Sequence, residues 1–199
     1  MRFFKNTFPI LISLFFVLKT NAQTIDINLL RHFNGPASHT DNFWEGVSNS
    51  DKFFVIATPA SMLVTGLAAH DQALKIKAFE TGGALLLAEG STLVLKQLTH
   101  RERPYLAHPD LFYGKSAATD YSFPSGHTSS AFATATSLSL AFLKWYVIAP
   151  SFAYATAVGY SRMYLGAHYP SDVLGGAIVG IGSAFLTFKL QYWLSRKIH

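Results

Sequence analysis

Apolar residues gather in stretches along the chain, separated by short polar connections. One lies near the N-terminus at 8–18, and the others lie at about 53–69, 79–98, 128–143, 146–160 and 173–190. These stretches are rich in Ala, Leu, Gly and Ser and show little β-branched alternation, which favours helices over strands. We therefore expect an all-α fold, a helical bundle whose segments pack side by side.

The N-terminal stretch has the layout of a secretory signal peptide. Arg2 and Lys5 precede the apolar run, and Ala22 offers a small residue before a cleavage point. The alternative is an uncleaved first membrane helix, and either outcome places residue 23 outside the cytoplasm. We divide the chain into a signal peptide or first membrane helix at 1–22, an exported segment with one or two short helices at 23–51, and a helical domain at 52–199.

Segment length alone does not separate a membrane bundle from a soluble one, because a span needs about 17–25 apolar residues and several stretches lie near the lower limit. The placement of cations favours the membrane. If residue 23 is outside, most cations beyond the motifs lie in connections on the cytoplasmic side, as the positive-inside rule expects: Lys75, Lys77, Lys144, Lys189, Arg196 and Lys197. We expect a membrane-embedded bundle with five to six transmembrane helices, in the inner membrane.

Two acidic residues keep the soluble alternative open. Glu80 and Glu89 lie inside the second of the five later stretches, and a carboxylate at membrane depth is costly unless it faces the bundle interior. Against this, Gly176 and Gly180 form a GxxxG pair, which is typical of close helix packing in membranes.

Composition excludes several classes of function. Only 14% of the 199 residues are charged, against about 25% in an average soluble domain. Cysteine is absent, which excludes disulfides, thiolate metal sites and cysteine nucleophiles. The net charge of +5 includes three cations in the first 22 residues, where no acidic residue lies. No basic stripe remains for nucleic acid.

Two polar motifs supply cations and a backbone anion site. Lys96 and Arg103 are seven residues apart, so one helix face extended past its end presents both cations. Pro124 makes a turn in the second motif, and Gly126 lets the backbone approach a ligand at the start of the next helix. Free N–H groups at a helix N-terminus bind anions. Each residue alone has an ordinary structural explanation, such as a snorkelling lysine or a turn.

A third motif joins a cation to a histidine and a carboxylate. Arg162 ends one predicted helix, and Pro170 is placed to occupy the first turn of the next. His168 then lies just before that helix and Asp172 in its first turn, close enough for the carboxylate to orient the imidazole. Together the motifs suit phosphoryl transfer, in which catalysis consists mostly of positioning and charge neutralisation.

The motifs in this order resemble a known family. Lys-x6-Arg-Pro, Pro-Ser-Gly-His and Ser-Arg-x5-His-x3-Asp are similar to the three-part signature of the type 2 phosphatidic acid phosphatase superfamily, and every signature position matches. The resemblance runs from Lys96 to Asp172, and the helix order extends it to about residues 52–190. The superfamily includes membrane lipid phosphatases, soluble bacterial acid phosphatases and vanadium haloperoxidases.

The resemblance implies a role for each motif residue. His168 is expected to be the nucleophile that forms a phosphohistidine, with Asp172 holding its tautomer, and His127 is expected to be the general acid. The phosphate-binding groups are expected to be the side chains of Lys96, Arg103, Ser125 and Arg162 and the amide of Gly126. The scheme needs no metal and no other cofactor.

The resulting expectation is a phosphatase acting on a lipid phosphate or diphosphate, with its site facing the periplasm. Candidate substrates are phosphatidate, phosphatidylglycerol phosphate, a polyprenyl diphosphate and a lipid A phosphate. The alternatives are a soluble exported acid phosphatase, a vanadate-dependent haloperoxidase, and a non-catalytic membrane protein that binds or transports phosphate.

Overall fold

The computed structural model describes residues 23–116 and 119–198, with side chains through residue 194. The predicted signal peptide or first membrane helix at 1–22 lies outside these residues, as do the side chains of Arg196 and Lys197.

The described residues form an all-α fold without strands, as the hydrophobic pattern predicts. A helical segment at 23–33 comes first. The helices that follow are α2 (Asp41–Ala68), α3 (Gln72–Thr99), α4 (Pro104–Ala107), α5 (Gly126–Phe142), α6 (Trp145–Tyr164) and α7 (Pro170–Ile198). The five long helices match the five later apolar stretches. α2 begins eleven residues before the expected domain boundary at residue 52, so that boundary falls within a helix.

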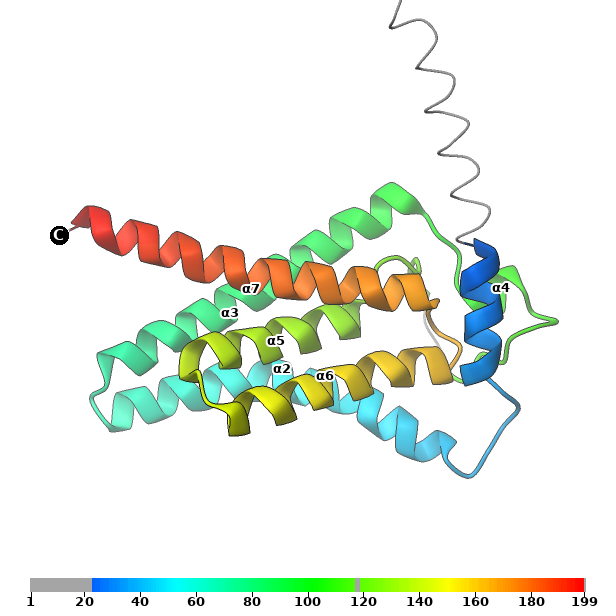
Figure 1. Cartoon of the computed structure of the whole chain (residues 1–199), viewed down its shortest axis with the longest axis horizontal. Coiled ribbons are helices and arrows are strands. Elements are labelled where there is room, and N and C mark those ends of the chain that lie inside the picture. Colours follow the sequence, from blue (N-terminus) through cyan, green and yellow to red (C-terminus); the bar gives the residue numbers. More distant parts are fainter. Residues whose placement is uncertain (1–22, 117–118, 199) are drawn as a thin grey trace, which may run out of the picture.

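The central helix of the bundle is α5, which packs against α2, α3, α6 and α7 (Figure 1). Its buried residues are Ala, Ser and Thr, whose small side chains let four neighbouring helices approach. On α7, a Cβ at Gly176 would lie 2.5 Å from the carbonyl oxygen of Ser125. The predicted GxxxG pair therefore lies in the contact between α5 and α7.

Large apolar side chains cover the outside of the bundle. Ile56 on α2 is 71% exposed, and Leu86 on α3 is 78% exposed. Among the described residues, α2 and the part of α7 at Pro170–Leu194 are long and apolar enough to span a membrane, yet only 17% and 22% of their most apolar windows are buried. A soluble bundle would bury such windows in its core, whereas this surface suits lipid.

One end of the bundle gathers the segments that carry the motifs. The end of α3, the beginnings of α5 and α7 and the end of α6 lie there, beside the segment 23–33 and α4 (Figure 1). The turns between α2 and α3 and between α5 and α6 lie at the opposite end. Residues far apart in the sequence are thus brought together at one end of the bundle.

Candidate active site

A cavity of about 360 Å³ lies at this end of the bundle. The fold brings six of the eight predicted site residues to its wall: Lys96, Arg103, Gly126, His127, Arg162 and His168. Asp172 and Ser125 are fully buried and do not line the cavity. The three motifs, which lie between Lys96 and Asp172 in the sequence, therefore surround one cavity.

Local capping residues place these side chains. α3 ends at Thr99, and Pro104 begins α4, so Arg103 lies in an extended segment just beyond α3. Ser125 is the N-cap of α5, and Pro170 begins α7. These helix starts agree with the sequence prediction. Arg103 lies past the end of the helix that carries Lys96, as the spacing predicts.

His168 is held in one orientation by hydrogen bonds at both ring nitrogens. Nδ1 lies 2.7 Å from the carbonyl oxygen of Ser122, and Nε2 lies 3.2 Å from Nη1 of Arg103. A carbonyl only accepts and a guanidinium only donates, so Nδ1 carries the proton and Nε2 carries the lone pair. Burial lowers the pKa of His168 from 6.5 to about 4, with smaller contributions from the charges of Arg162 and Arg103. The ring is a neutral imidazole at pH 7.

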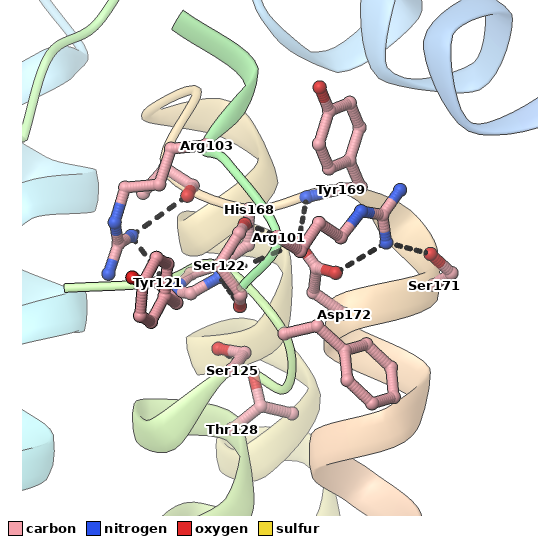
Figure 2. Close-up of polar contacts among 12 residues, drawn as sticks. Arg101, Arg103, Tyr121, Ser122, Ser125, Thr128, His168, Tyr169, Ser171 and Asp172 are labelled. Carbon is pink, nitrogen blue, oxygen red and sulfur yellow. Dashed lines mark hydrogen bonds and ion pairs between the residues drawn. The ribbon is translucent and has the colours of Figure 1, made fainter. Parts of the chain in front are cut away.

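Asp172 lies behind His168 and orients it indirectly. Its Oδ2 is 3.7 Å from Nδ1 of His168, whereas it accepts hydrogen bonds of 2.5 Å from the Ser122 hydroxyl and 2.8 Å from the Tyr169 amide (Figure 2). The spacing of the two residues predicts that the carboxylate lies close enough to orient the imidazole, and the structure brings the two side chains together. In the structure Asp172 fixes Ser122, and the Ser122 carbonyl accepts the imidazole proton.

Arg101 is a functional candidate that the sequence analysis missed. Its Nη1 donates to Oδ1 of Asp172 at 2.6 Å and to the Ser171 hydroxyl at 2.7 Å (Figure 2). Its Nη2 donates to Asp26 at 2.7 Å. Its guanidinium lies over the Tyr169 ring, 4.1 Å from the centroid. It occupies an unspecified position between Lys96 and Arg103, so the motif gave no signal for it.

Asp120 pairs with both cations of the first motif. Its Oδ2 lies 2.7 Å from Nζ of Lys96, and its Oδ1 lies 2.5 Å from Nη2 of Arg103. Burial alone would raise the pKa of Asp120, but the Lys96 and Arg103 charges lower it to about 2. The Asp120 side chain is 56% exposed, whereas the two cations are almost fully buried. A single carboxylate thus bridges two cations that suit phosphate.

Arg162 and His127 complete the polar wall. Arg162 donates to the Ser48 hydroxyl at 2.5 Å, and its Nε has no hydrogen-bond partner among the described residues. His127 lines the same cavity. The Ser125 hydroxyl instead accepts from Thr128 at 2.9 Å. Its expected contact with phosphate stays a prediction.

The segment expected to lie outside the helical domain also contributes to the site. Asn49 and Asp51 of this segment line the cavity, Ser48 binds Arg162, and Asp26 binds Arg101. Within residues 23–116 and 119–198, no group of three or more His, Asp or Glu side chains could hold a metal ion. Positive charge for an anion comes from Lys96, Arg103 and Arg162.

Comparison with known proteins identifies relatives by both sequence and structure. An undecaprenyl-diphosphatase of Sulfolobus acidocaldarius is 35% identical over 54% of this chain and 50% of its own length. A lipid A 4'-phosphatase of Bacteroides thetaiotaomicron is 28% identical over 87% of this chain and 80% of its own length. The first match therefore spans about half the length of that relative.

Solved structures share the architecture. The crystal structure of Aquifex aeolicus LpxE has a TM-score of 0.68 and 28% identity, covering 81% of this chain and 93% of that one. A transmembrane PAP2-type phosphatidylglycerolphosphate phosphatase from Bacillus subtilis has the same fold, with a TM-score of 0.67, 23% identity, and coverage of 92% and 96%. The family model of the PAP2 superfamily matches residues 77–196, and the chain belongs to that superfamily.

Proposed function

We propose that this protein is an integral membrane phosphatase that hydrolyses a lipid phosphate or diphosphate through a phosphohistidine. The observation that carries the proposal is the neutral His168, whose Nε2 lone pair lies beside Arg103 in a cavity shared with His127. A positioned, unprotonated nitrogen next to phosphate-binding cations is the arrangement that nucleophilic catalysis at phosphorus requires.

The reaction consists of two displacements. Nε2 of His168 attacks phosphorus, the P–O bond to the leaving group breaks, and His127 donates its proton to the departing oxygen. His127 then removes a proton from water as the water oxygen attacks phosphorus, and the P–N bond breaks to release phosphate. Lys96, Arg103 and Arg162 neutralise charge on the equatorial oxygens, and no metal ion takes part.

The cations must release Asp120 for this chemistry to proceed. Because the Asp120 carboxylate bridges Lys96 and Arg103, a phosphate that binds both cations takes its place. The exposed Asp120 side chain can turn toward solvent, whereas the buried cations stay at the cavity wall.

Apolar side chains at the cavity and on the outside of the bundle support a lipid substrate. Val55 and Leu93 line the cavity, and Leu93 is also 60% exposed on the outside of α3. The next residues in the sequence, Ile56 and Val94, are also exposed. An acyl or prenyl chain can lie against this surface while its phosphate reaches His168. The names of the relatives, an undecaprenyl-diphosphatase and a lipid A phosphatase, point to the same substrate class.

The distribution of lysines supports a site that faces the periplasm. Lys75 and Lys77 lie beside the turn between α2 and α3, and Lys144 lies between α5 and α6, both at the end opposite the cavity. The positive-inside rule places that end in the cytoplasm and the cavity outside. A signal peptide or membrane helix at 1–22 agrees with this orientation.

Phosphate release by purified full-length protein in detergent micelles tests the proposal. We expect hydrolysis of lipid phosphates in the presence of EDTA, and inhibition by vanadate. His168→Ala should lower kcat by at least about a thousandfold, and an acid-labile, alkali-stable phosphoryl label seen in the wild type should disappear. His39→Ala, which changes an exposed histidine, is the matched control. Full activity in His168→Ala, or hydrolysis that depends on a metal ion, would contradict the proposal.

A further inference from the structure

Three buried polar atoms that find no hydrogen-bond partner among the described residues belong to side chains that line the cavity. They are Oδ1 of Asp51 on α2, Oγ1 of Thr92 on α3 and Nε of Arg162 on α6. The three side chains are at least nine-tenths buried. A buried polar atom without a partner is costly, so a ligand that supplies the missing hydrogen bonds binds favourably here.

Two of these atoms require opposite kinds of partner, whereas the Thr92 hydroxyl can donate or accept. Nε of Arg162 donates and suits the phosphate oxygens. Oδ1 of Asp51 accepts, and a phosphate dianion offers it only further acceptors and negative charge. Ser130 donates to the other carboxylate oxygen, Oδ2, at 2.7 Å, which holds the Asp51 carboxylate in place. The Asp51 oxygen therefore matches a donor on a different part of the substrate.

Residues of α3 in the same lining show how far the cavity extends from the cations. Glu89, Thr92 and Lys96 all line the cavity and are three and four residues apart, so they share one face of the helix. At about 1.5 Å per residue, Thr92 lies about 6 Å and Glu89 about 10 Å from Lys96 along the axis, toward the middle of the bundle. The cavity thus continues from the phosphate-binding cations to a region with two carboxylates.

We propose that Asp51, with Thr92 and Glu89, forms a subsite for a hydrogen-bond donor on the alcohol part of the substrate. The ligand class is a phosphate ester whose head group carries a hydroxyl or amide N–H near the ester oxygen, such as a phosphoglycerol or an amino-sugar phosphate. An isoprenyl diphosphate brings a second phosphate and no donor to these carboxylates. Phosphatidate brings no donor either. This inference rests on the proposed function and narrows its substrate class.

Matched substrates test the subsite in the wild-type protein. Phosphatidylglycerol phosphate is compared with its deoxy analogue, which lacks only the head-group hydroxyl, in the same micelles. We expect kcat/KM for the hydroxyl-bearing substrate to be about ten- to a hundredfold higher, the range that corresponds to the cost of leaving a buried acceptor unsatisfied. A glucosamine-linked lipid phosphate and an isoprenyl diphosphate form two further arms, which separate a glycerol donor from a sugar donor.

Variants assign the preference to Asp51. Asp51→Leu should bring the ratio of kcat/KM for the hydroxyl-bearing substrate and its deoxy analogue close to one. Asp51→Asn, which keeps one carbonyl acceptor, should leave part of the preference. Glu45→Gln removes an exposed carboxylate from the same helix and should leave the ratio unchanged.

Two results would overturn the subsite. Equal kcat/KM values for the parent and deoxy substrates in the wild type would do so, whether or not any variant folds. An equal loss with both substrates in Asp51→Leu would show that Asp51 acts on the phosphate or on the fold. If the wild type hydrolyses every substrate without preference, only the subsite fails, whereas no hydrolysis of any substrate means that the proposed function fails as well.

Discussion

Nη1 of Arg101 donates a 2.6 Å hydrogen bond to Oδ1 of Asp172, and through this pair the N-terminal segment reaches the predicted nucleophile. Asp26 binds the other side of the Arg101 guanidinium at 2.7 Å. Asp172 in turn accepts from the Ser122 hydroxyl, and the Ser122 carbonyl accepts from His168. The chain of contacts makes Arg101 a positioning residue that acts through Asp172.

Replacing Arg101 should therefore impair both stability and turnover. Arg101→Ala leaves the fully buried Asp172 without its charged partner, and we expect the free energy of unfolding to fall by about 3 kcal/mol. We expect kcat to fall by about tenfold or more, equivalent to about 1.4 kcal/mol in the barrier, with a smaller change in KM. The measurements are steady-state kinetics and thermal unfolding in detergent.

A graded series separates positioning by Arg101 from a merely structural role. Arg101→Lys keeps the charge but loses the two-sided contact, so it should recover part of the stability and less of kcat. Asp26→Asn should lower kcat less than Arg101→Ala does. If Arg101→Ala loses stability but keeps the wild-type kcat, Arg101 supports the fold alone.

Asp120 should compete with phosphate for Lys96 and Arg103. Asp120→Asn removes the negative charge that bridges the two cations, so we expect inorganic phosphate and vanadate to bind about tenfold more tightly, because one unit of charge repulsion is lost. Inhibition constants measured at low ionic strength test this. Asp110→Asn, at an exposed position before the same loop, is the control. Unchanged or weaker inhibition would show that Asp120 only holds the cations in place.

The lowered pKa of His168 should set the acid limit of activity. Burial lowers this pKa from 6.5 to about 4, so the neutral nucleophile persists down to about pH 4. We expect the acid limb of the kcat/KM profile for the free enzyme near pH 4, provided that the protein stays folded. A limb near 6.5 assigned to His168 would contradict the buried, neutral imidazole.

The same shift makes folding depend on pH in a definite direction. The unfolded chain takes up a proton at His168 near pH 6.5, but the folded protein does so only near pH 4. Stability is therefore lost as the pH falls from 6.5 to 4, because the unfolded state binds more protons in that interval. The difference in thermal midpoint between the wild type and His168→Ala, followed across that interval, isolates the contribution of this group.

The helix ends at the site could be predicted from the sequence because local residues determine them. Pro170 begins α7, and Gly126 follows the N-cap of α5, so the second and third motifs had to lie at helix starts. The predicted topology placed these helix ends on the same side of the bundle, so the three motifs were expected to lie together. Two of the three cations of the site, Lys96 and Arg162, lie in the last turns of α3 and α6.

The supporting contacts could not be predicted, because they depend on tertiary contacts between distant segments. The run Ser48-Asn49-Ser50-Asp51 favours a turn by its local propensity. In the structure it is helical, and Asn49 and Asp51 line the cavity. Packing overrides that propensity: Ser48 binds Arg162 of α6, and Ser50 lies 2.8 Å from the Tyr154 hydroxyl. Asp120 and Arg101 likewise carry no local signal, since their partners lie elsewhere in the chain.

The contact between α5 and α7 that holds the second and third motifs together should depend on Gly180. A Cβ at Gly180 would collide with backbone atoms of Ser129 and Ala133 on α5, which cannot move independently of the helix. We expect Gly180→Ala to lower the free energy of unfolding by about 1–3 kcal/mol, the usual cost of overpacking.

Gly182 provides the matched control on the same helix. A Cβ there meets nothing within 4 Å, so Gly182→Ala should instead stabilise α7 by about 0.5–1 kcal/mol through its helix propensity. Thermal unfolding of both variants in detergent measures the difference. Because α7 carries Asp172 and α5 carries His127, separating these helices should also lower kcat in Gly180→Ala. Equal stability of the two variants would show that α5 and α7 are not in backbone contact at this position.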